Sequence, residues 1–405
     1  MSLNVYSEIS KLKTVLLHRP GEELNNLSPS ILARLLFDDI PDLPLAQKEH
    51  DQFAEVLRKS GVEVVYLGDL MKDVLSDSKV KAKFLDDYIS EAQLESEHQA
   101  DAVRNYLESL GNDALFGKLV AGIRREEIPS TGKQSLFSMI GNENPLIIDP
   151  MPNLYFTRDP FAITGRGVSL NHMRTVTRNR ETLFGKYIFE HHPRFKQSQV
   201  PFWYDRSYNA ALEGGDILTL SDKIVAIGVS QRTDADSIEI FAKRLFSSDE
   251  PFEKIIAFDI PKTRAFMHLD TVFTMIDKDA FTIHPGIEGP LTIYTLEKTS
   301  DDGEFVIHKE QDPIETILAR HLGIDKVDLI RCGGDSIIDA EREQWNDGSN
   351  TLAIAPGEVI VYDRNYVTNG LLRERGFKLH EIGSSELSRG RGGPRCMSMP
   401  LFREA

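Results

Sequence analysis

Hydrophobic positions near the start of the chain predict short strands separated by a helix. Residues 14–17 form an apolar run that Pro20 and Gly21 close, which is typical of a strand followed by a turn. Residues 47–60 place apolar side chains on one helical face, and residues 62–67, VEVVYL, form a short β-branched run. These patterns predict an α/β domain.

The apolar pattern changes between residues 76 and 140. Val80, Phe84 and Tyr88 recur at helical spacing, and strand signals are few in this segment. We therefore expect an all-helical domain at 76–140, inserted into an α/β domain that comprises 1–75 and 141–405.

After this segment, a polar or acidic residue is repeatedly followed by an alternating apolar strand. The pattern occurs at 157–164 (TRDPFAIT), 213–222 (EGGDILTLSD) and 268–277 (HLDTVFTMID). Such self-similarity is typical of a radial repeat, and five similar units would close a ring. Ordinary strand–helix alternation produces a similar spacing, so the pattern alone leaves both arrangements open.

Composition excludes several classes of function. A net charge of −16 over 405 residues argues against a nucleic-acid binder. No stretch approaches the roughly 20 apolar residues that span a membrane, and the N-terminal residues do not resemble a signal peptide. With only two cysteines, a disulfide scaffold is not expected. We expect a cytoplasmic protein that binds neither nucleic acid nor membrane and forms a homo-oligomer.

Common metal and nucleotide motifs are absent. The sequence has no HExxH and no CxxC spacing, and GNDALFGKL at 111–119 lacks the Lys-Ser/Thr ending of a phosphate loop. We therefore expect no cofactor and no structural metal.

A histidine and three carboxylates are the candidates for chemistry. In a strand, His268 and Asp270 would project side by side from one face. Radial repeats would bring them to Asp159 and Glu213 in one pocket. Carboxylates gathered in this way repel one another unless a cation lies between them. A hard metal ion and a planar guanidinium both satisfy that requirement.

Cys396 adds a nucleophile to these groups. It follows a run of Gly and Arg, RGGPRC, whereas Cys332 follows an apolar strand and is expected to be buried. A thiolate is a poor ligand for magnesium or calcium but a strong nucleophile. Its attack on a guanidinium carbon, with His268 as the proton donor, is one coherent chemistry.

Long motifs across the chain resemble the arginine deiminase family. They are MPNLYFTRDP at 151–160, EGGDILTL at 213–220, HLDTVFTMID at 268–277 and RGGPRCMSMPLFRE at 391–404, with shorter matches at 35–41 and near 180–183. They occur in the family's order and extend over essentially the whole chain. The helical insert also has the position expected for this family.

This resemblance implies a fold, a reaction and a set of site residues. The fold would be an α/β propeller of five pseudo-symmetric repeats with a helical insert, and the reaction would be hydrolysis of L-arginine to L-citrulline and ammonia without a metal. Cys396 would be the nucleophile, His268 the general acid and base, and Glu213, Asp159 and Asp270 the guanidinium ligands. The implied substrate-binding residues are Asn153, Phe156, Arg180, Arg232, Leu36, Gly390 and Arg391.

Three other functions compete with this interpretation. A related amidinotransferase or dimethylarginine hydrolase would share the Cys/His/carboxylate site, although the insert and the RNRE stretch favour the deiminase. A thiol peptidase would not need three carboxylates around a cation. A non-catalytic arginine-binding protein would not need Cys396 and His268.

Overall fold

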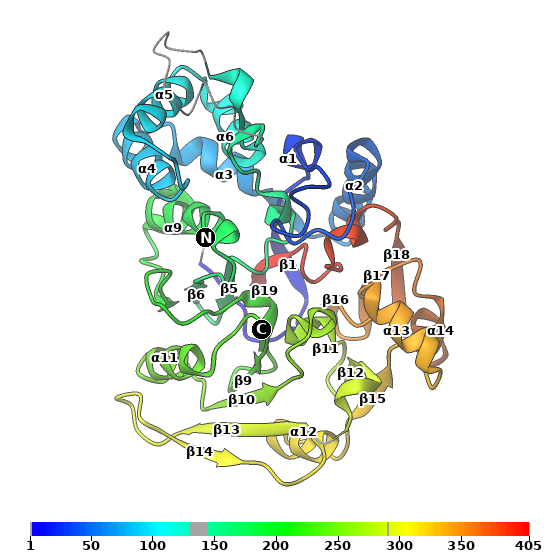
Figure 1. The fold of residues 1–405 in the computed structure, drawn as a ribbon. Helices are drawn as coiled ribbons and strands as arrows, with labels where there is room; N and C mark the ends of the chain where they lie inside the picture. Colours follow the sequence, from blue (N-terminus) through cyan, green and yellow to red (C-terminus); the bar gives the residue numbers. More distant parts are fainter. Residues whose placement is uncertain (1, 129–143, 290, 405) are drawn as a thin grey trace.

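The computed structural model describes residues 2–128, 144–289 and 291–404. The boundary that the sequence predicts at 140/141 lies outside these ranges. In the described residues, short sheets surround the middle of the molecule and most of the longer helices lie toward its outside (Figure 1). The protein therefore has a mixed α/β fold.

Five sheets among the described residues contain the same pairing pattern. In each, two strands pair in antiparallel fashion and one of them pairs in parallel with a third strand. None of these sheets closes on itself. The first such group is β19 (Met399–Arg403), β1 (Leu12–Leu17) and β2 (Glu63–Tyr66). It joins the two ends of the chain in one sheet.

The remaining sheets follow in chain order. They are β5 (Phe161–Thr164), β6 (Gly167–Leu170) and β7 (Phe202–Tyr204); β8 (Ile217–Thr219), β9 (Ile224–Val229) and β10 (Lys254–Asp259), extended by β13 (Thr292–Lys298) and β14 (Phe305–Lys309); β11 (Phe273–Met275), β12 (Ala280–Ile283) and β15 (Asp328–Arg331); β16 (Leu352–Ala355), β17 (Glu358–Tyr362) and β18 (Lys378–Ile382); and the two-stranded pair β3 (Ile123–Arg124) and β4 (Leu146–Ile148).

Helices connect the parallel strands and cover the sheets. They are α1 (Glu22–Asn25), α2 (Leu43–Lys59), α3 (Leu67–Val74), α4 (Ser78–Ser90), α5 (Glu97–Glu108), α6 (Asn112–Ala121), α8 (Val176–Asn179), α9 (Glu181–His191), α10 (Pro193–Lys196), α11 (Ala235–Phe246), α12 (Ile314–Leu322), α13 (Ile337–Trp345) and α14 (Tyr366–Glu374). The group α3 to α6 gathers at the top of Figure 1.

The early predicted elements are present, with shifted ends. The helix expected at 47–60 begins four residues earlier, at Leu43, because Asp42 caps it by accepting a hydrogen bond from the backbone N–H of Leu45 (2.9 Å). Pro44 lies in its first turn, where the missing N–H is tolerated. The strand expected at 62–67 is shorter, since α3 starts directly after Tyr66.

The core lies between the sheets and the helices that cross over them. Helix α11, for example, buries Phe241 and Leu245 against Val225 and Ile227 of β9. Burying a large apolar side chain contributes about 1.5–3 kcal/mol. Such packing holds the loops at the inner ends of the strands, which carry the polar residues described next.

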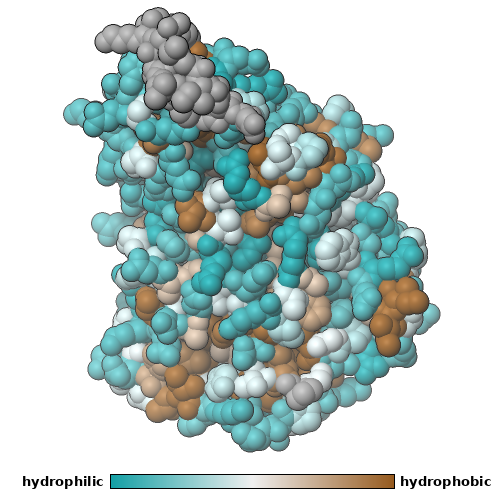
Figure 2. Space-filling view, viewed as in Figure 1, coloured by the Kyte–Doolittle hydropathy of each residue, from teal (hydrophilic) through white to brown (hydrophobic). Residues whose placement is uncertain are grey.

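The outer surface is mostly hydrophilic, in agreement with the acidic composition (Figure 2). One apolar patch lies on the right-hand edge, in the region of α13 and α14. Ile337, Ile338 and Tyr366 from these two helices are among the most exposed large apolar side chains. No described helix has the length and apolar composition needed to cross a membrane.

Candidate active site

The thiol of Cys396 lies on the loop that leads into β19, and it is 2% exposed. Its Sγ is 3.4 Å from Oδ2 of Asp270 and 3.1 Å from Nδ2 of Asn350. Burial raises the pKa of Cys396 well above its usual value, and the carboxylates of Asp270 and Asp159 raise it further. The thiol is therefore protonated at neutral pH, and a cation nearby would favour its ionisation.

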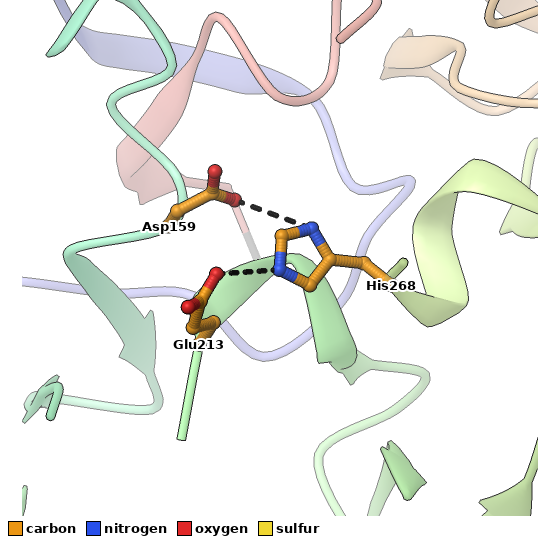
Figure 3. A group of neighbouring side chains, drawn as sticks. All are labelled: Asp159, Glu213 and His268. Atoms are coloured by element: carbon orange, nitrogen blue, oxygen red, sulfur yellow. Dashed lines mark hydrogen bonds and ion pairs between the residues drawn. The ribbon is translucent and has the colours of Figure 1, made fainter. Parts of the chain in front are cut away.

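His268 is held between two carboxylates (Figure 3). Its Nε2 lies 2.7 Å from Oε2 of Glu213, and its Nδ1 lies 3.8 Å from Oδ1 of Asp159. Burial alone would lower the pKa of His268, but the carboxylates of Asp159 and Glu213 outweigh it and raise the pKa to about 9. The imidazole is therefore a cation at neutral pH and can donate a proton.

Glu213 precedes a short 3-10 turn, η3 (Gly214–Asp216), and is fully buried. Burial opposes its charge, but Arg232 and His268 outweigh it and lower the pKa of Glu213 to about 2. A Cβ at Gly215 would lie 2.6 Å from Nδ1 of His268. Gly215, two residues after Glu213, therefore permits the close approach of the imidazole.

Two carboxylate oxygens beside the thiol and the imidazole are buried and have no hydrogen-bond partner among the described residues. They are Oδ1 of Asp159 and Oδ1 of Asp270, while Oδ2 of Asp270 accepts a hydrogen bond from Arg395 Nη1 at 2.7 Å. Buried polar atoms are nearly always paired in a working protein, so these oxygens are suited to bind a cationic ligand. We call the residues that meet here the Cys396 cluster: Asp159, Glu213, His268, Asp270 and Cys396.

The expectation that His268 and Asp270 lie side by side on a strand is wrong. Residues Leu269–Thr271 form a 3-10 turn, η5, and strand β11 begins only at Phe273. The backbone N–H of Leu269 donates a hydrogen bond to Oδ1 of Asp216 (2.7 Å), which bends the chain into the turn. The two side chains therefore diverge, with His268 contacting Glu213 and Asp270 facing the thiol.

A buried arginine that the sequence interpretation missed, Arg178, also reaches the cluster. Its Nη1 donates to Oδ2 of Asp159 at 2.9 Å and lies 3.9 Å from Oε2 of Glu213. The guanidinium also pairs with Glu181, three residues later. This Arg/Glu spacing across one helical turn is the sequence signal that could have identified it.

The two arginines predicted to bind substrate differ in position. Arg232 reaches the cluster, since its Nη1 lies 3.4 Å from Oε2 of Glu213. Arg180 instead donates a hydrogen bond to the backbone carbonyl of Asp149 (2.9 Å) and lies over the ring of Tyr88, 5.2 Å from its centroid. The structure thus brings Arg232 to the cluster and gives Arg180 contacts elsewhere.

The loop before the nucleophile carries Gly390 and Arg391. Gly390 ends a 3-10 turn, η7 (Leu387–Gly390), that packs against Phe156. Arg391 follows with a φ of 65° and is buried, with its guanidinium carbon 3.5 Å from the ring centroid of Trp345. None of its guanidinium nitrogens has a hydrogen-bond partner among the described residues. Its guanidinium is therefore held by stacking on Trp345 and by the charge of Asp38, 3.8 Å away.

Asn153 and Leu36 are brought close together from distant parts of the chain. Nδ2 of Asn153, in the 3-10 turn η2 (Pro152–Tyr155), donates to the backbone carbonyl of Leu35 at 2.7 Å. The next residue, Leu36, is half-buried and has a φ of 63°, an uncommon conformation for a side chain of this kind. The hydrogen bond to its neighbour supports this conformation.

Two other residues near the thiol were not indicated by the sequence. Asn350 contacts Cys396, and Asp347 is buried with neither carboxylate oxygen hydrogen-bonded to a described residue. Burial raises the pKa of Asp347 to about 7. Both belong to the segment between α13 and β16, which contains no chemical motif.

Asp159, Glu213 and His268 present ligand atoms within 4.8 Å of one another, so they form a candidate metal group. However, His268 is protonated at neutral pH and donates to Glu213, while Asp159 is paired with Arg178. A protonated imidazole cannot coordinate a metal. A metal would have to displace this proton and the pairing with Arg178, whereas an organic cation with N–H donors would leave both in place.

Cys332 has a different environment, in which Oγ1 of Thr368 lies 3.5 Å from its Sγ. It is fully buried, and burial raises the pKa of its thiol to about 12. The expectation that it acts as a small buried apolar residue is confirmed.

Comparison with known proteins gives one consistent result over the whole chain. The family model for arginine deiminase matches residues 33–403. The arginine deiminase of Clostridium perfringens is 56% identical over 100% of this chain and 98% of its own length. The arginine deiminase of Streptococcus uberis is 55% identical over 99% of this chain and 98% of its own length.

Solved structures with a similar fold are much more distant in sequence. An amidinotransferase of saxitoxin biosynthesis from Microseira wollei superposes with a TM-score of 0.56 at 14% identity, covering 100% of this chain and 98% of its own. A dimethylarginine dimethylaminohydrolase in adduct with S-methyl-L-thiocitrulline has a TM-score of 0.51 at 13% identity, covering 96% of this chain and 99% of its own. At these low sequence identities, the similarity shows a shared fold.

Proposed function

The chain belongs to the arginine deiminase family, and on this premise we propose that it hydrolyses L-arginine to L-citrulline and ammonia through a covalent intermediate on Cys396. One observation carries the assignment of the site. The Oδ1 atoms of Asp159 and Asp270, which accept no hydrogen bond from a described residue, lie with the Cys396 thiol and the protonated His268. This combination suits a guanidinium whose central carbon is attacked by sulfur.

The substrate guanidinium would bind between the carboxylates. Asp159 and Asp270 would each accept hydrogen bonds from its N–H groups, and Glu213 would bind it while orienting His268 at 2.7 Å. The cation would also offset the repulsion that keeps the thiol of Cys396 protonated. Substrate binding would thus promote release of the thiol proton to solvent.

The reaction would then proceed in two halves. The Cys396 thiolate adds to the guanidinium carbon, and ammonia leaves with a proton from His268, which gives an S-amidino enzyme. Neutral His268 then takes a proton from water, whose oxygen adds to the same carbon. Collapse of this adduct breaks the C–S bond, restores the thiolate and releases citrulline. The proton that remains on the ureido oxygen of citrulline passes to the released ammonia.

The α-carboxylate of arginine also requires cationic partners. We propose Arg232 and Arg178 for this role, because both lie within 4 Å of Glu213. Arg180, the partner expected from the sequence, contacts Asp149 and Tyr88. We propose that it holds the segment leading to Asn153, which would bind the α-amino end.

The remaining pocket residues would form its walls. Phe156 and Leu36 would line the aliphatic part of the substrate, and Gly390 and Arg391 would close over it. Because the members of the Cys396 cluster are at most 3% exposed, substrate entry requires this loop to move.

We further propose that the five sheets with the same pairing pattern are five repeats of a pseudo-symmetric propeller. This catalytic domain would comprise residues 1–75 and 141–405, with 76–140 as a helical insert. Helices α4 to α6 lie in this part of the sequence, between β2 and β5, which supports the division.

We place the enzyme in the cytoplasm, because both cysteines are unpaired and a reducing compartment preserves a thiol nucleophile. We also propose a homo-oligomer, for which the exposed apolar side chains of α13 and α14 offer a contact surface. Analytical ultracentrifugation at several protein concentrations tests this assembly.

The activity is tested by supplying arginine, agmatine and methylated arginines separately and measuring the ureido products, such as citrulline, and the amine or ammonia released. Arginine alone should give rapid, equimolar release of citrulline and ammonia. Faster turnover of dimethylarginine would indicate a dimethylarginine hydrolase. Transfer of the amidino group to an added amine, without ammonia release, would indicate an amidinotransferase.

A further inference from the structure

Asn350 connects the nucleophile loop to the acidic side of the site. It is fully buried and lies two residues before β16. Both the oxygen and the nitrogen of its side-chain amide make hydrogen bonds. Oδ1 accepts hydrogen bonds from the backbone N–H groups of Gly393 (3.1 Å) and Cys396 (3.0 Å). Nδ2 donates to the backbone carbonyl of Asp270 (3.0 Å) and to Sγ of Cys396 (3.1 Å).

These four contacts require both an acceptor and a donor on one short side chain. Asparagine provides a carbonyl oxygen with two lone pairs and an amide nitrogen with two hydrogens. An aspartate would supply the acceptor and lose the donors, and a leucine of similar shape would supply neither. Asn350 is thus the smallest neutral side chain that satisfies the whole set.

The loop is packed directly against this residue. A Cβ at Gly393 would lie 2.5 Å from the backbone oxygen of Asn350 and 2.9 Å from its Oδ1. Only glycine lets the backbone come close enough for the hydrogen bond from its N–H. The Gly-Pro-Arg-Cys segment therefore closes onto Asn350 at two places, Gly393 and Cys396.

The charges around the sulfur give the contact from Nδ2 a chemical consequence. Asp270, Asp159 and Asp347 all disfavour a thiolate on Cys396, and Arg395 is the cation that favours it. Arg395 is itself paired with Glu8 and Asp270. An N–H donor aimed at the sulfur would favour the thiolate in the same direction as Arg395, without adding a charge.

We propose that Asn350 is a positioning residue for the nucleophile: its Oδ1 holds the Cys396 loop in place, and its Nδ2 donates to the sulfur and stabilises the thiolate. The proposal rests on the assignment of Cys396 as the nucleophile. No bond to Asn350 forms or breaks, and the amide keeps both of its hydrogens throughout.

Two variants separate the donor role from a purely structural one. Asn350→Asp keeps the acceptor that holds the loop and removes the donor to sulfur. Asn350→Leu removes both without adding a charge. Asn369→Leu is the matched control, since Asn369 is equally buried and donates to Tyr362 and Glu381, outside the Cys396 cluster. All are made in a Cys332→Ala background, so that alkylation reports on Cys396.

The measurements are kcat and KM for arginine, and the pH dependence of iodoacetamide inactivation. We expect kcat to fall about 10- to 100-fold in both Asn350 variants, as for loss of a hydrogen bond to a charged group. KM should change by less than about 3-fold. Alkylation should require a higher pH than in the parent, while the control keeps the parent's pH profile.

Three outcomes would overturn the proposal. The first is an Asn350→Asp enzyme with the kcat and alkylation profile of the parent, because the acceptor alone would then suffice. The second is a loss of activity in all three variants that is proportional to the fall in their melting temperatures. The third is a rise in KM with kcat unchanged. If Asn350→Leu does not fold, Asn350→Asp decides alone.

A Cys396→Ala enzyme assayed in parallel keeps the two proposals distinct. If Cys396→Ala is active, the assignment of the nucleophile fails. If it is inactive while both Asn350 variants match the parent, only the role of Asn350 fails.

Discussion

Nε2 of His268 lies 2.7 Å from Oε2 of Glu213, and both side chains are buried. The pair forms an ion pair, since the pKa of Glu213 is lowered to about 2 and that of His268 is raised to about 9. A histidine in this setting keeps its proton through neutral pH. It therefore meets the substrate as an acid and becomes a base only after it has protonated the leaving ammonia.

This pair makes stability depend on pH. The pKa of His268 rises on folding from its ordinary value of 6.5 to about 9, so its contribution is complete below pH 6.5 and is lost as pH rises through 9. Between pH 6 and 8, the melting temperature of the parent should fall more steeply than that of His268→Gln. Thermal unfolding followed by circular dichroism measures both slopes, and equal slopes would contradict the raised pKa.

His268 should also dominate the rate. Removing a general acid/base typically lowers the rate by about 10²–10⁴-fold, and the loss here should reach the upper end because one residue serves both halves of the reaction. We expect His268→Ala to bind arginine and to turn over at this reduced rate. Stopped assays for citrulline measure it, and a near-parental kcat would remove His268 from the mechanism.

The two cysteines should respond oppositely to substitution. Cys396→Ala should abolish citrulline formation, whereas Cys332→Ala should keep most of the activity, because Cys332 is fully buried and its thiol contacts Thr368. Mass spectrometry of rapidly quenched enzyme should detect the amidino adduct on the peptide that contains Cys396. The reverse pattern, with Cys332→Ala inactive, would reassign the nucleophile.

Activity should survive exhaustive chelation. Glu213 is already paired with His268 and Asp159 with Arg178, so the group that could hold a metal is occupied by protein cations. The parent enzyme should keep its full kcat after dialysis against a chelator and passage over a metal-free column. Loss of activity that added divalent cations restore would show that a metal takes part.

Recognition of the α-carboxylate should appear as discrimination against agmatine, which lacks that group. A buried cation left without its partner costs several kcal/mol, so kcat/KM for agmatine should be lower by about 10³-fold or more. Arg232→Ala should mainly raise KM for arginine and reduce the difference in kcat/KM between arginine and agmatine. Comparable values for the two substrates in the parent would indicate a broader guanidine hydrolase.

Arg178 and Arg180 provide a matched comparison within one helical turn. Arg178→Ala should narrow the gap between arginine and agmatine, because Arg178 reaches Glu213, whereas Arg180→Ala should leave the ratio close to the parental value. The ratio of the two kcat/KM values measures this directly. A larger effect from Arg180→Ala would restore it as the carboxylate ligand.

Much of this protein could be predicted from short stretches of sequence, because local periodicity and turn chemistry depend on neighbouring residues. The apolar run at β1, the helical face of α2 and the buried Cys332 follow from such patterns. The long motifs around His268 and Cys396 also identify the family, and with it the chemistry.

Only the tertiary structure decided which groups meet. His268 occupies a turn and not a strand because Asp216, distant in sequence, accepts the N–H of Leu269. Which arginine reaches the carboxylates depends on how α8 packs, and the spacing of Arg178 to Glu181 by itself indicates only a local ion pair. Asn350 lies in no motif, since the role that we propose for it depends on a loop from a distant part of the chain. Contacts of this kind depend on how separate elements pack together, and no periodicity along the chain records them.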